Sequence, residues 1–256
     1  MSDFLMERHG KTALFILNRP EKYNTFSIDM MFQMHDALNE FMADPELLTG
    51  IITGAGKGFC AGADVSNWLP YAKENLEKPW NIPTTPMRGM YVTKPLIAAV
   101  HGAAFGGGAE LAISCDFRIA AENASFKWPE AAIGTFPRQG GTQRLPRLVG
   151  LSRALEIMIT NERVAAEKAL EIGLVNKVVP QEKLLEESFA FADKINKLAP
   201  LAVQAIKKSM YEGYGRPLED GLAIESHLGK QMFFTEDYEE GTRAFREKRE
   251  PQFKGR

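Results

Sequence analysis

Residues 94–150 constrain the fold most strongly, because in this stretch an apolar run passes through a cluster of glycines into a helical sequence. The run Leu96–Val100 is bounded by Lys-Pro before it and His-Gly after it, which indicates a buried strand. Glycines occupy positions 106–108 and lead into the helical sequence AELAI. Free backbone N–H groups and the positive end of the helix dipole would therefore face the space beyond the strand. The pattern predicts an anion-binding site there.

Two acidic residues follow this turn, and the sequence allows two roles for each. Glu110 lies three positions after Gly107, on the same helical face, and Glu130 follows Pro129 in an apolar setting. Each could be an acid that complements the first turn of a helix, or a catalytic carboxylate. Glycines let a ligand oxygen approach the backbone closely, as a reaction that builds negative charge on a carbonyl oxygen requires. Both readings stay open for each acid alone, and the pair favours catalysis.

Composition and charge exclude several classes of protein. The chain has 256 residues and a formal net charge of −2 without a basic block, so charge predicts neither a nucleic-acid surface nor an anionic-membrane surface. Cys60 and Cys115 lack CxxC spacing, which argues against a zinc site or a disulfide framework. The N-terminal residues do not read as a secretory signal, and no apolar run has the length of a membrane span. We expect a cytoplasmic protein with reduced thiols and a small-molecule partner.

The rest of the chain reads as an α/β core followed by helices. We expect strands at 13–17, 47–53 and 174–179, and a helix capped by Ser27. Residues 66–92 show no sustained period, which predicts a long loop that is functional or mobile. The C-terminal helices are expected at 181–198, 200–212, 217–234 and 236–248. The organisation predicted is a core over 1–195 and a helical region over 196–256.

Several motifs together resemble the enoyl-CoA hydratase/isomerase (crotonase) superfamily. They are NRPEKYNTFS, GKGFCAGAD, GAAFGGGAELAISCDFRIA, FKWPEAAIGTFPRQGGTQRLPRLVG and EGTRAFREKREPQF, and they span essentially the whole chain. The resemblance implies an α/β fold built as a spiral of ββα units. It also implies a helical C-terminal region that trimerises and covers the active site, with a homotrimer or a hexamer (a dimer of trimers) as the assembly.

The resemblance also implies roles for particular residues. The backbone N–H groups of Ala63 and Gly107 would form an oxyanion hole, and Glu110 and Glu130 would be the catalytic acids. Residues implied to bind coenzyme A or substrate are Ala61, Asp64, Val65, Phe245 and Lys248, the last two reaching the ligand of a neighbouring subunit. Asp64 would also fix its loop through side-chain to backbone hydrogen bonds. On charge pattern alone, Lys248 reads instead as a solvated helix lysine.

Departures from the usual motif bear on the acyl group. Arg138 and Gln139 stand where hydratases of short substrates commonly have small residues, Trp128 occupies a position that is often polar, and Ser66 one where lysine is frequent. We expect a bulky or cyclic acyl group in a pocket formed by the following residues: Trp68, Trp80, Trp128, Phe136 and Arg138. Packing of the rings within their own loop is the other reading for the aromatic residues.

The activity implied is reversible addition of water across the 2,3 double bond of an enoyl-CoA thioester, without a metal or other cofactor, since coenzyme A is part of the substrate. Two close carboxylates should titrate together, with at least one pKa raised. A double-bond isomerase, another acyl-CoA lyase or hydrolase and a catalytically silent assembly subunit remain alternatives. An RNA-binding relative is the alternative from another class, although the charge pattern does not favour it.

Overall fold

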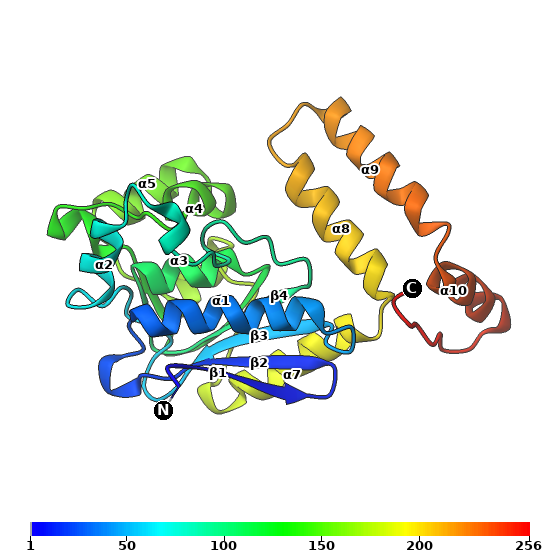
Figure 1. Ribbon diagram of the computed structural model, residues 1–256, viewed down its shortest axis with the longest axis horizontal. Coiled ribbons are helices and arrows are strands. Elements are labelled where there is room, and N and C mark those ends of the chain that lie inside the picture. Colours follow the sequence, from blue (N-terminus) through cyan, green and yellow to red (C-terminus); the bar gives the residue numbers. More distant parts are fainter. Residues whose placement is uncertain (1) are drawn as a thin grey trace.

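The computed structural model describes residues 2–256 and is organised around a six-stranded sheet (Figure 1). The strand order is β1-β2-β3-β4-β6-β9, in which β1 and β2 form an antiparallel hairpin and the later pairings are parallel. The bounds are Phe4–His9 (β1), Thr12–Leu17 (β2), Thr49–Gly54 (β3), Leu96–Val100 (β4), Phe117–Ala121 (β6) and Lys177–Val179 (β9). The strand predicted at 96–100 is confirmed, and those predicted at 47–53 and 174–179 begin later than expected.

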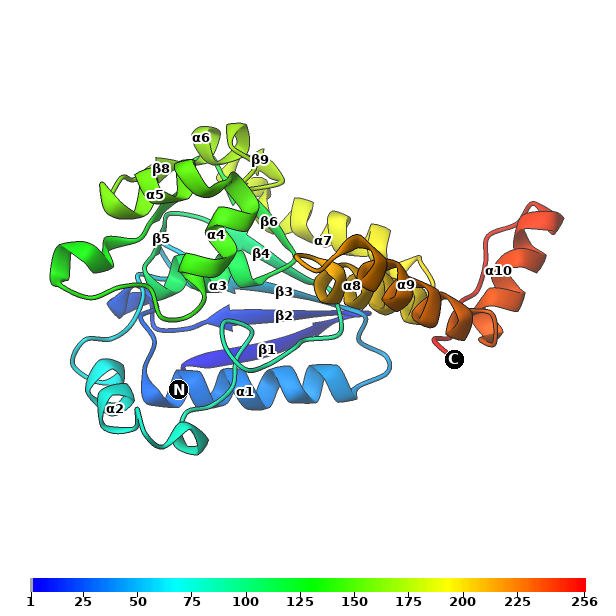
Figure 2. The same ribbon diagram turned by 90° about the horizontal axis from the view of Figure 1, so that it is seen from above.

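Helices cover both faces of this sheet (Figure 2). On one face lies α1 (Ile28–Ala43), whose cap is confirmed because the Met30 N–H donates to Ser27 Oγ at 3.0 Å. On the other face α7 (Leu184–Asn196) buries Leu184 and Ala192 against β-strand residues. Because β4 is buried along its whole length, its sequence is a continuous apolar run rather than an alternating one.

A smaller three-stranded sheet positions the glycine-rich turn. Its order is β5-β7-β8, with bounds Ala103–Phe105, Ser125–Lys127 and Val164–Ala165. The chain leaves β5 directly into α3 (Gly107–Ser114). The loop after β3 is joined to β5, since Cys60 N–H donates to Ala103 O at 3.0 Å and Phe105 N–H donates to Cys60 O at 2.9 Å. Two loops distant in sequence therefore meet beyond the carboxyl ends of β3 and β4.

Residues 66–92 are more ordered than the sequence pattern predicts. They contain α2 (Trp68–Glu74) and a 3₁₀ turn at Pro79–Asn81. The short helix buries Trp68, while Pro70 lies in its first turn, where a proline is tolerated. A helix of 7 residues, about two turns, is too short to produce a recognisable apolar period.

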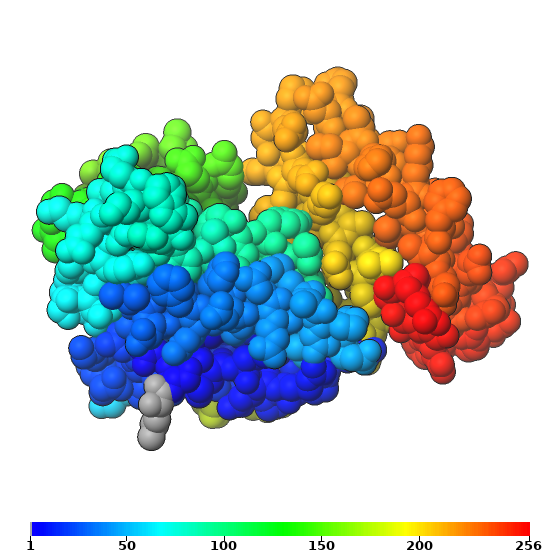
Figure 3. All heavy atoms as spheres, viewed as in Figure 1, coloured from blue at the N-terminus to red at the C-terminus, as the bar shows by residue number. Residues whose placement is uncertain are grey.

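Three further helices follow the glycine-rich turn, and three more form a separate C-terminal part. The first set comprises α4 (Gly141–Val149), α5 (Leu151–Ile159) and α6 (Ala166–Glu171). The second comprises α8 (Pro200–Gly213), α9 (Leu218–Met232) and α10 (Glu236–Glu247), which lie at one end of the molecule (Figure 3). All the helices expected after residue 180 are present. The division between 195 and 196 stays a prediction.

The C-terminal helices expose many large apolar side chains. An ion pair of 2.6 Å between Lys207 Nζ and Asp116 Oδ2 fixes α8 to the core. Exposed apolar residues on α8 to α10 and their connections include Ile206, Met210, Tyr211, Tyr214, Leu218, Leu222, Phe233, Phe234, Tyr238 and Phe245. Exposed apolar area of this extent is typical of a surface that contacts another protein chain. Within residues 2–256, no helix has the length and apolar character needed to cross a bilayer.

Candidate active site

Two backbone N–H groups from different loops lie side by side at the glycine-rich turn. A Cβ placed on Gly107 would lie 3.8 Å from Ala63 N, and one placed on Gly62 would lie 3.4 Å from Gly107 N. Neither the Ala63 nor the Gly107 N–H donates a hydrogen bond within residues 2–256. Gly107 is the first residue of α3, so its N–H also has no partner inside the helix. Two unpaired donors next to each other can bind one oxygen atom that carries negative charge.

Glu130 approaches this pair of donors from a second element. It lies in the 3₁₀ helix Pro129–Ile133, whose proline occupies the first turn. A Cβ on Gly106 would lie 3.2 Å from Glu130 Oε1, and Gly106 has a φ of +52°, so both contact and conformation favour glycine there. Glu130 Oε2 is buried without a hydrogen-bond partner among the described residues. Burial raises the pKa of Glu130, which favours the protonated acid.

Glu110 is the second carboxylate, and only 2% of it is exposed. Its Oε1 accepts hydrogen bonds from the N–H groups of Gln139 and Gly141, both at 2.8 Å. Burial raises the pKa of Glu110 to about 7; the two N–H donors oppose this shift and the charge of Glu130 adds to it. A carboxyl group with a pKa near neutrality is suited to proton transfer at physiological pH. The expectation that at least one acid has a raised pKa is confirmed.

Trp128 packs against the same corner of the site. Its Nε1 lies 3.0 Å from the point that a Cβ on Gly141 would occupy, and Glu110 Oε1 lies 3.0 Å from that point too. The ring is 1% exposed, and its N–H has no partner among residues 2–256. A large rigid side chain therefore stands next to the carboxylate that the sequence predicts to be catalytic.

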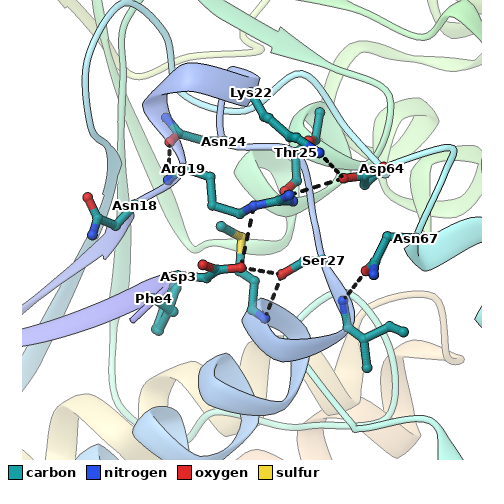
Figure 4. Close-up of polar contacts among 12 residues, drawn as sticks. Asp3, Phe4, Asn18, Arg19, Lys22, Asn24, Thr25, Ser27, Asp64 and Asn67 are labelled. Atoms are coloured by element: carbon teal, nitrogen blue, oxygen red, sulfur yellow. Dashed lines mark hydrogen bonds and ion pairs between the residues drawn. The ribbon is translucent and has the colours of Figure 1, made fainter. Parts of the chain in front are cut away.

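A polar network holds the loop that carries Ala63 (Figure 4). Asp64 Oδ1 accepts hydrogen bonds from the backbone N–H and hydroxyl of Ser66, at 3.0 and 2.7 Å. Its Oδ2 pairs with Arg19 Nη2 at 3.2 Å and with Lys22 Nζ at 3.7 Å. The Ser66 hydroxyl, outweighing the effect of burial, lowers the pKa of Asp64 to about 2, and Arg19 adds to this. Asp64 stays ionised and fixes its loop, as the sequence predicts.

Comparison with known proteins decides the family. The profile of the enoyl-CoA hydratase/isomerase family matches residues 7–256. The chain belongs to this family. It is 40% identical over 251 residues to the short-chain-enoyl-CoA hydratase of Clostridium acetobutylicum, covering 97% of this chain and 96% of that one. It is 39% identical over 259 residues to the 2,3-dehydroadipyl-CoA hydratase of Escherichia coli, covering 100% of both.

Solved structures of the enoyl-CoA hydratase/isomerase family have the same fold. An enoyl-CoA hydratase from Bacillus anthracis superposes with a TM-score of 0.93 at 36% identity, over 99% of this chain and 100% of that one. The crotonase-like α/β fold expected from the sequence is confirmed.

The other residues to which the family resemblance assigns a role differ in their exposure to solvent. Val65 is exposed at the end of the Ala63 loop, and Phe136 and Arg138 are exposed in the segment between Glu130 and α4. Trp80 is 77% exposed in the 3₁₀ turn after α2, whereas Trp68 is buried beside Tyr71, with 5.8 Å between ring centroids. Ala61 is partly buried and donates its N–H to Tyr23 O at 2.9 Å. Their contact with substrate stays a prediction.

Phe245 and Lys248 lie far in space from α3. Figures 1 and 2 both show α10 far from the α3 helix. Phe245 is 86% exposed, and Lys248 follows α10 with a φ of +56°. Neither residue can therefore reach the Glu110 site of its own chain in this arrangement.

Four contributors to the site were not predicted from the sequence. Gln139 and Gly141 act through backbone N–H groups, which carry no signal of residue type. Arg19 stands in the NRP motif directly after β2, and a charged residue at the end of a buried strand could have suggested a loop anchor. Phe26 pairs with Ala63 through a β-bridge that local pattern does not reveal.

Within residues 2–256, no group of three or more His, Cys, Asp or Glu side chains is arranged to hold a metal ion.

Proposed function

We propose that this member of the enoyl-CoA hydratase/isomerase family is an enoyl-CoA hydratase, which adds water reversibly across the 2,3 double bond of an enoyl-CoA thioester. One observation carries the proposal: Glu130 lies against Gly106, next to the unpaired N–H groups of Gly107 and Ala63, and Glu110 is buried three residues after Gly107 in α3. Both carboxyl groups have a raised pKa. The similarity to proteins named as hydratases supports it.

The first step is polarisation of the thioester. Its carbonyl oxygen accepts hydrogen bonds from the Ala63 and Gly107 N–H groups, which form the oxyanion hole. Negative charge grows on that oxygen as the enolate forms, so the donors bind the transition state more tightly than the substrate. By analogy with other oxyanion holes, each donor contributes on the order of 3 kcal/mol.

The carboxyl groups then divide the transfer of protons. Glu110 activates a water molecule and accepts its proton while the water oxygen forms a bond to C3. The π electrons of the 2,3 double bond move toward C2 and the carbonyl oxygen, which gives the enolate. Glu130, protonated at the start, delivers its proton to C2 as the carbonyl re-forms. Burial at both acids supports this assignment, because it holds their pKa values above the ordinary carboxyl range.

Coenzyme A is part of the substrate, and we propose no metal or other cofactor. Ala61, Asp64 and Val65 contact its adenine and pantetheine parts. Phe245 and Lys248 contact the coenzyme A bound by a neighbouring subunit. The distance of α10 from α3, together with the exposed apolar side chains of α8 to α10, supports a homotrimer or a dimer of trimers.

The acyl group is the part of the substrate that the pocket residues would select. We infer a bulky or cyclic acyl chain in contact with the residues Trp68, Trp80, Trp128, Phe136 and Arg138. The rigid ring of Trp128 beside Glu110 supports a role in shaping that space. We also propose a cytoplasmic location. The two buried, unpaired thiols, Cys60 and Cys115, support it.

A panel of straight-chain and cyclic 2-enoyl-CoA esters tests the function. The purified protein should remove the thioester-conjugated absorbance of at least one member, and the product should gain the mass of one water. Rates across the panel rank the acyl groups. Conversion without a change in mass would replace the proposal with a double-bond isomerase. Binding without any conversion would exclude both activities.

A further inference from the structure

Phe26 contacts both halves of the pair of N–H donors, one through its backbone and the other through its ring. We propose that Phe26 is a positioning residue that sets the distance between the Ala63 and Gly107 N–H groups, and thereby the strength with which they polarise a thioester. This inference rests on the proposed function.

The backbone of Phe26 fixes the direction of the Ala63 N–H. Phe26 N–H donates to Gly62 O at 2.8 Å, and Asp64 N–H donates to Phe26 O at 3.0 Å. Successive N–H groups of an extended segment point to opposite sides. Because Gly62 O and Asp64 N both face Phe26, the Ala63 N–H between them points away from Phe26.

The ring of Phe26 packs against the backbone of Gly107. Its Cε2 and Cδ2 atoms lie 3.0 and 3.3 Å from the point that a Cβ on Gly107 would occupy. The side chain is 1% exposed and belongs to the main apolar core, so its rotamer is fixed by packing. One rigid side chain therefore joins the start of α3 to the segment that pairs with Ala63.

A charged clamp holds the backbone on each side of this connection. Arg19 Nη1 donates to the carbonyl of Thr25, the residue before Phe26, at 2.7 Å, while Nη2 pairs with Asp64, the residue after Ala63 (Figure 4). The Arg19 side chain also pairs with Asp3 at 3.4 Å. The bridge between Phe26 and Ala63 thus has little freedom to slide, and the ring is the contact with Gly107 that a side-chain substitution can remove while the bridge is kept.

Shortening the ring should therefore alter catalysis more than binding. Phe26→Leu keeps the backbone bridge and removes the contact with Gly107, which lets the two donors separate. A misplacement of about 1 Å can reduce an enzymatic rate by about 100-fold. We expect kcat to fall about 10-fold in Phe26→Leu and about 100-fold in Phe26→Ala, with KM changed less than about 3-fold.

Phe41 offers a matched control. It is 0% exposed and belongs to the same apolar core, but it packs edge-on against Phe15, with 5.5 Å between centroids, near the C-terminal end of α1. Phe41→Leu should lower thermal stability by an amount similar to Phe26→Leu, because both changes remove ring atoms from a packed core. It should leave kcat within about 2-fold.

The decisive readout is the C=O stretching frequency of an enoyl thioester bound to each protein, measured by infrared difference spectroscopy. Hydrogen bonds from the two donors lower this frequency. The wild type and Phe41→Leu should show the same lowered frequency, and Phe26→Leu should shift it back toward the value in water. The proposal would be overturned if Phe26→Leu showed the same C=O frequency as the wild type. It would also be overturned if Phe41→Leu lost as much kcat as Phe26→Leu.

A double-mutant cycle tests the ring contact itself. Gly107→Ala adds a Cβ that meets the Phe26 ring in the wild type, whereas Phe26→Leu makes room for it. The loss of kcat caused by Gly107→Ala should therefore be smaller in the Phe26→Leu background, and independent effects would contradict the contact. If the wild type binds acyl-CoA but does not hydrate it, the proposed function fails, while the infrared comparison still tests the positioning role.

Discussion

Glu110 Oε1 and Trp128 Nε1 converge on Gly141: each lies 3.0 Å from the point that a Cβ on that glycine would occupy. The Gly141 N–H also donates to Glu110 Oε1 at 2.8 Å. A side chain at position 141 would therefore press on both the carboxylate and the indole ring and displace one of them.

The change Gly141→Ala should displace Glu110 from its two N–H donors. Contacts of 3.0 Å force a neighbour to move, and both neighbours are buried and packed. We expect kcat to fall by about 10-fold or more, with a smaller change in KM. Gly229→Ala in α9 is the control, because a Cβ there meets no atom within 4 Å. Equal kinetics in the two variants would show that the position of Glu110 does not depend on Gly141.

The pH dependence of the reaction follows from Glu110. With a pKa raised to about 7, Glu110 loses its function as a base as the pH falls through 7. The hydration rate, kcat/KM, should therefore decrease below about pH 7, rather than near pH 4.5 as an ordinary carboxyl group would predict. A pH profile that stays flat down to pH 5 would remove Glu110 from the rate-determining proton transfer.

The same raised pKa affects stability. A carboxyl group with a folded-state pKa above its unfolded value costs stability once it ionises, so the cost is absent below about pH 4.5 and complete above about pH 7. A shift of this size corresponds to about 3 kcal/mol. Glu110→Gln keeps an oxygen for the two N–H donors and should raise the melting temperature at pH 8 but not at pH 4. A melting temperature unchanged at both values would contradict the assigned pKa.

Replacing Glu130 with glutamine should stop proton transfer at C2. The variant retains the shape of the side chain but cannot exchange a proton, so exchange of a C2 proton of a saturated acyl-CoA with deuterated water should disappear. Binding of the same ester, measured by calorimetry, should persist. Normal exchange by Glu130→Gln would assign the C2 proton to another residue.

Local sequence signals predicted a large part of the architecture, because burial and helix capping depend on residues close together in the chain. Leu96–Val100 is apolar throughout because it is buried on both faces, and Ser27 caps α1 through a hydrogen bond to a residue three positions later. Such features depend on neighbours in sequence. Two other pairings join residues far apart in the chain: Phe26 with Ala63, and Arg19 with Asp64. No local sequence pattern predicts them. The short helix α2 was not predicted because it is too short to show a clear apolar period.

The site was predictable where a residue type is itself the signal. Glu110 and Glu130 stand out as acids in apolar sequence, and Gly107 as part of a glycine cluster before a helix. The donors from Gln139 and Gly141 are backbone groups that any residue supplies, and only the folded structure brings them to Glu110.

Removing one donor at a time tests the oxyanion hole. Gly107→Pro deletes the N–H at the first position of α3, where a helix accepts proline, and Gly107→Ala adds a Cβ but keeps the N–H. Proline should reduce kcat by about 100-fold to 1,000-fold relative to alanine, since that comparison isolates the lost donor. Equal rates for the two variants would exclude the Gly107 N–H from catalysis.

The most direct test of the account is hydration of a 2-enoyl-CoA ester in water that carries both ¹⁸O and deuterium, with the product examined by mass spectrometry and NMR. The hydratase mechanism predicts one ¹⁸O at C3 and one deuterium at C2 in the same product, formed by the wild type and abolished in Glu130→Gln. Deuterium incorporated without ¹⁸O, together with a moved double bond, would contradict the hydratase mechanism and identify an isomerase.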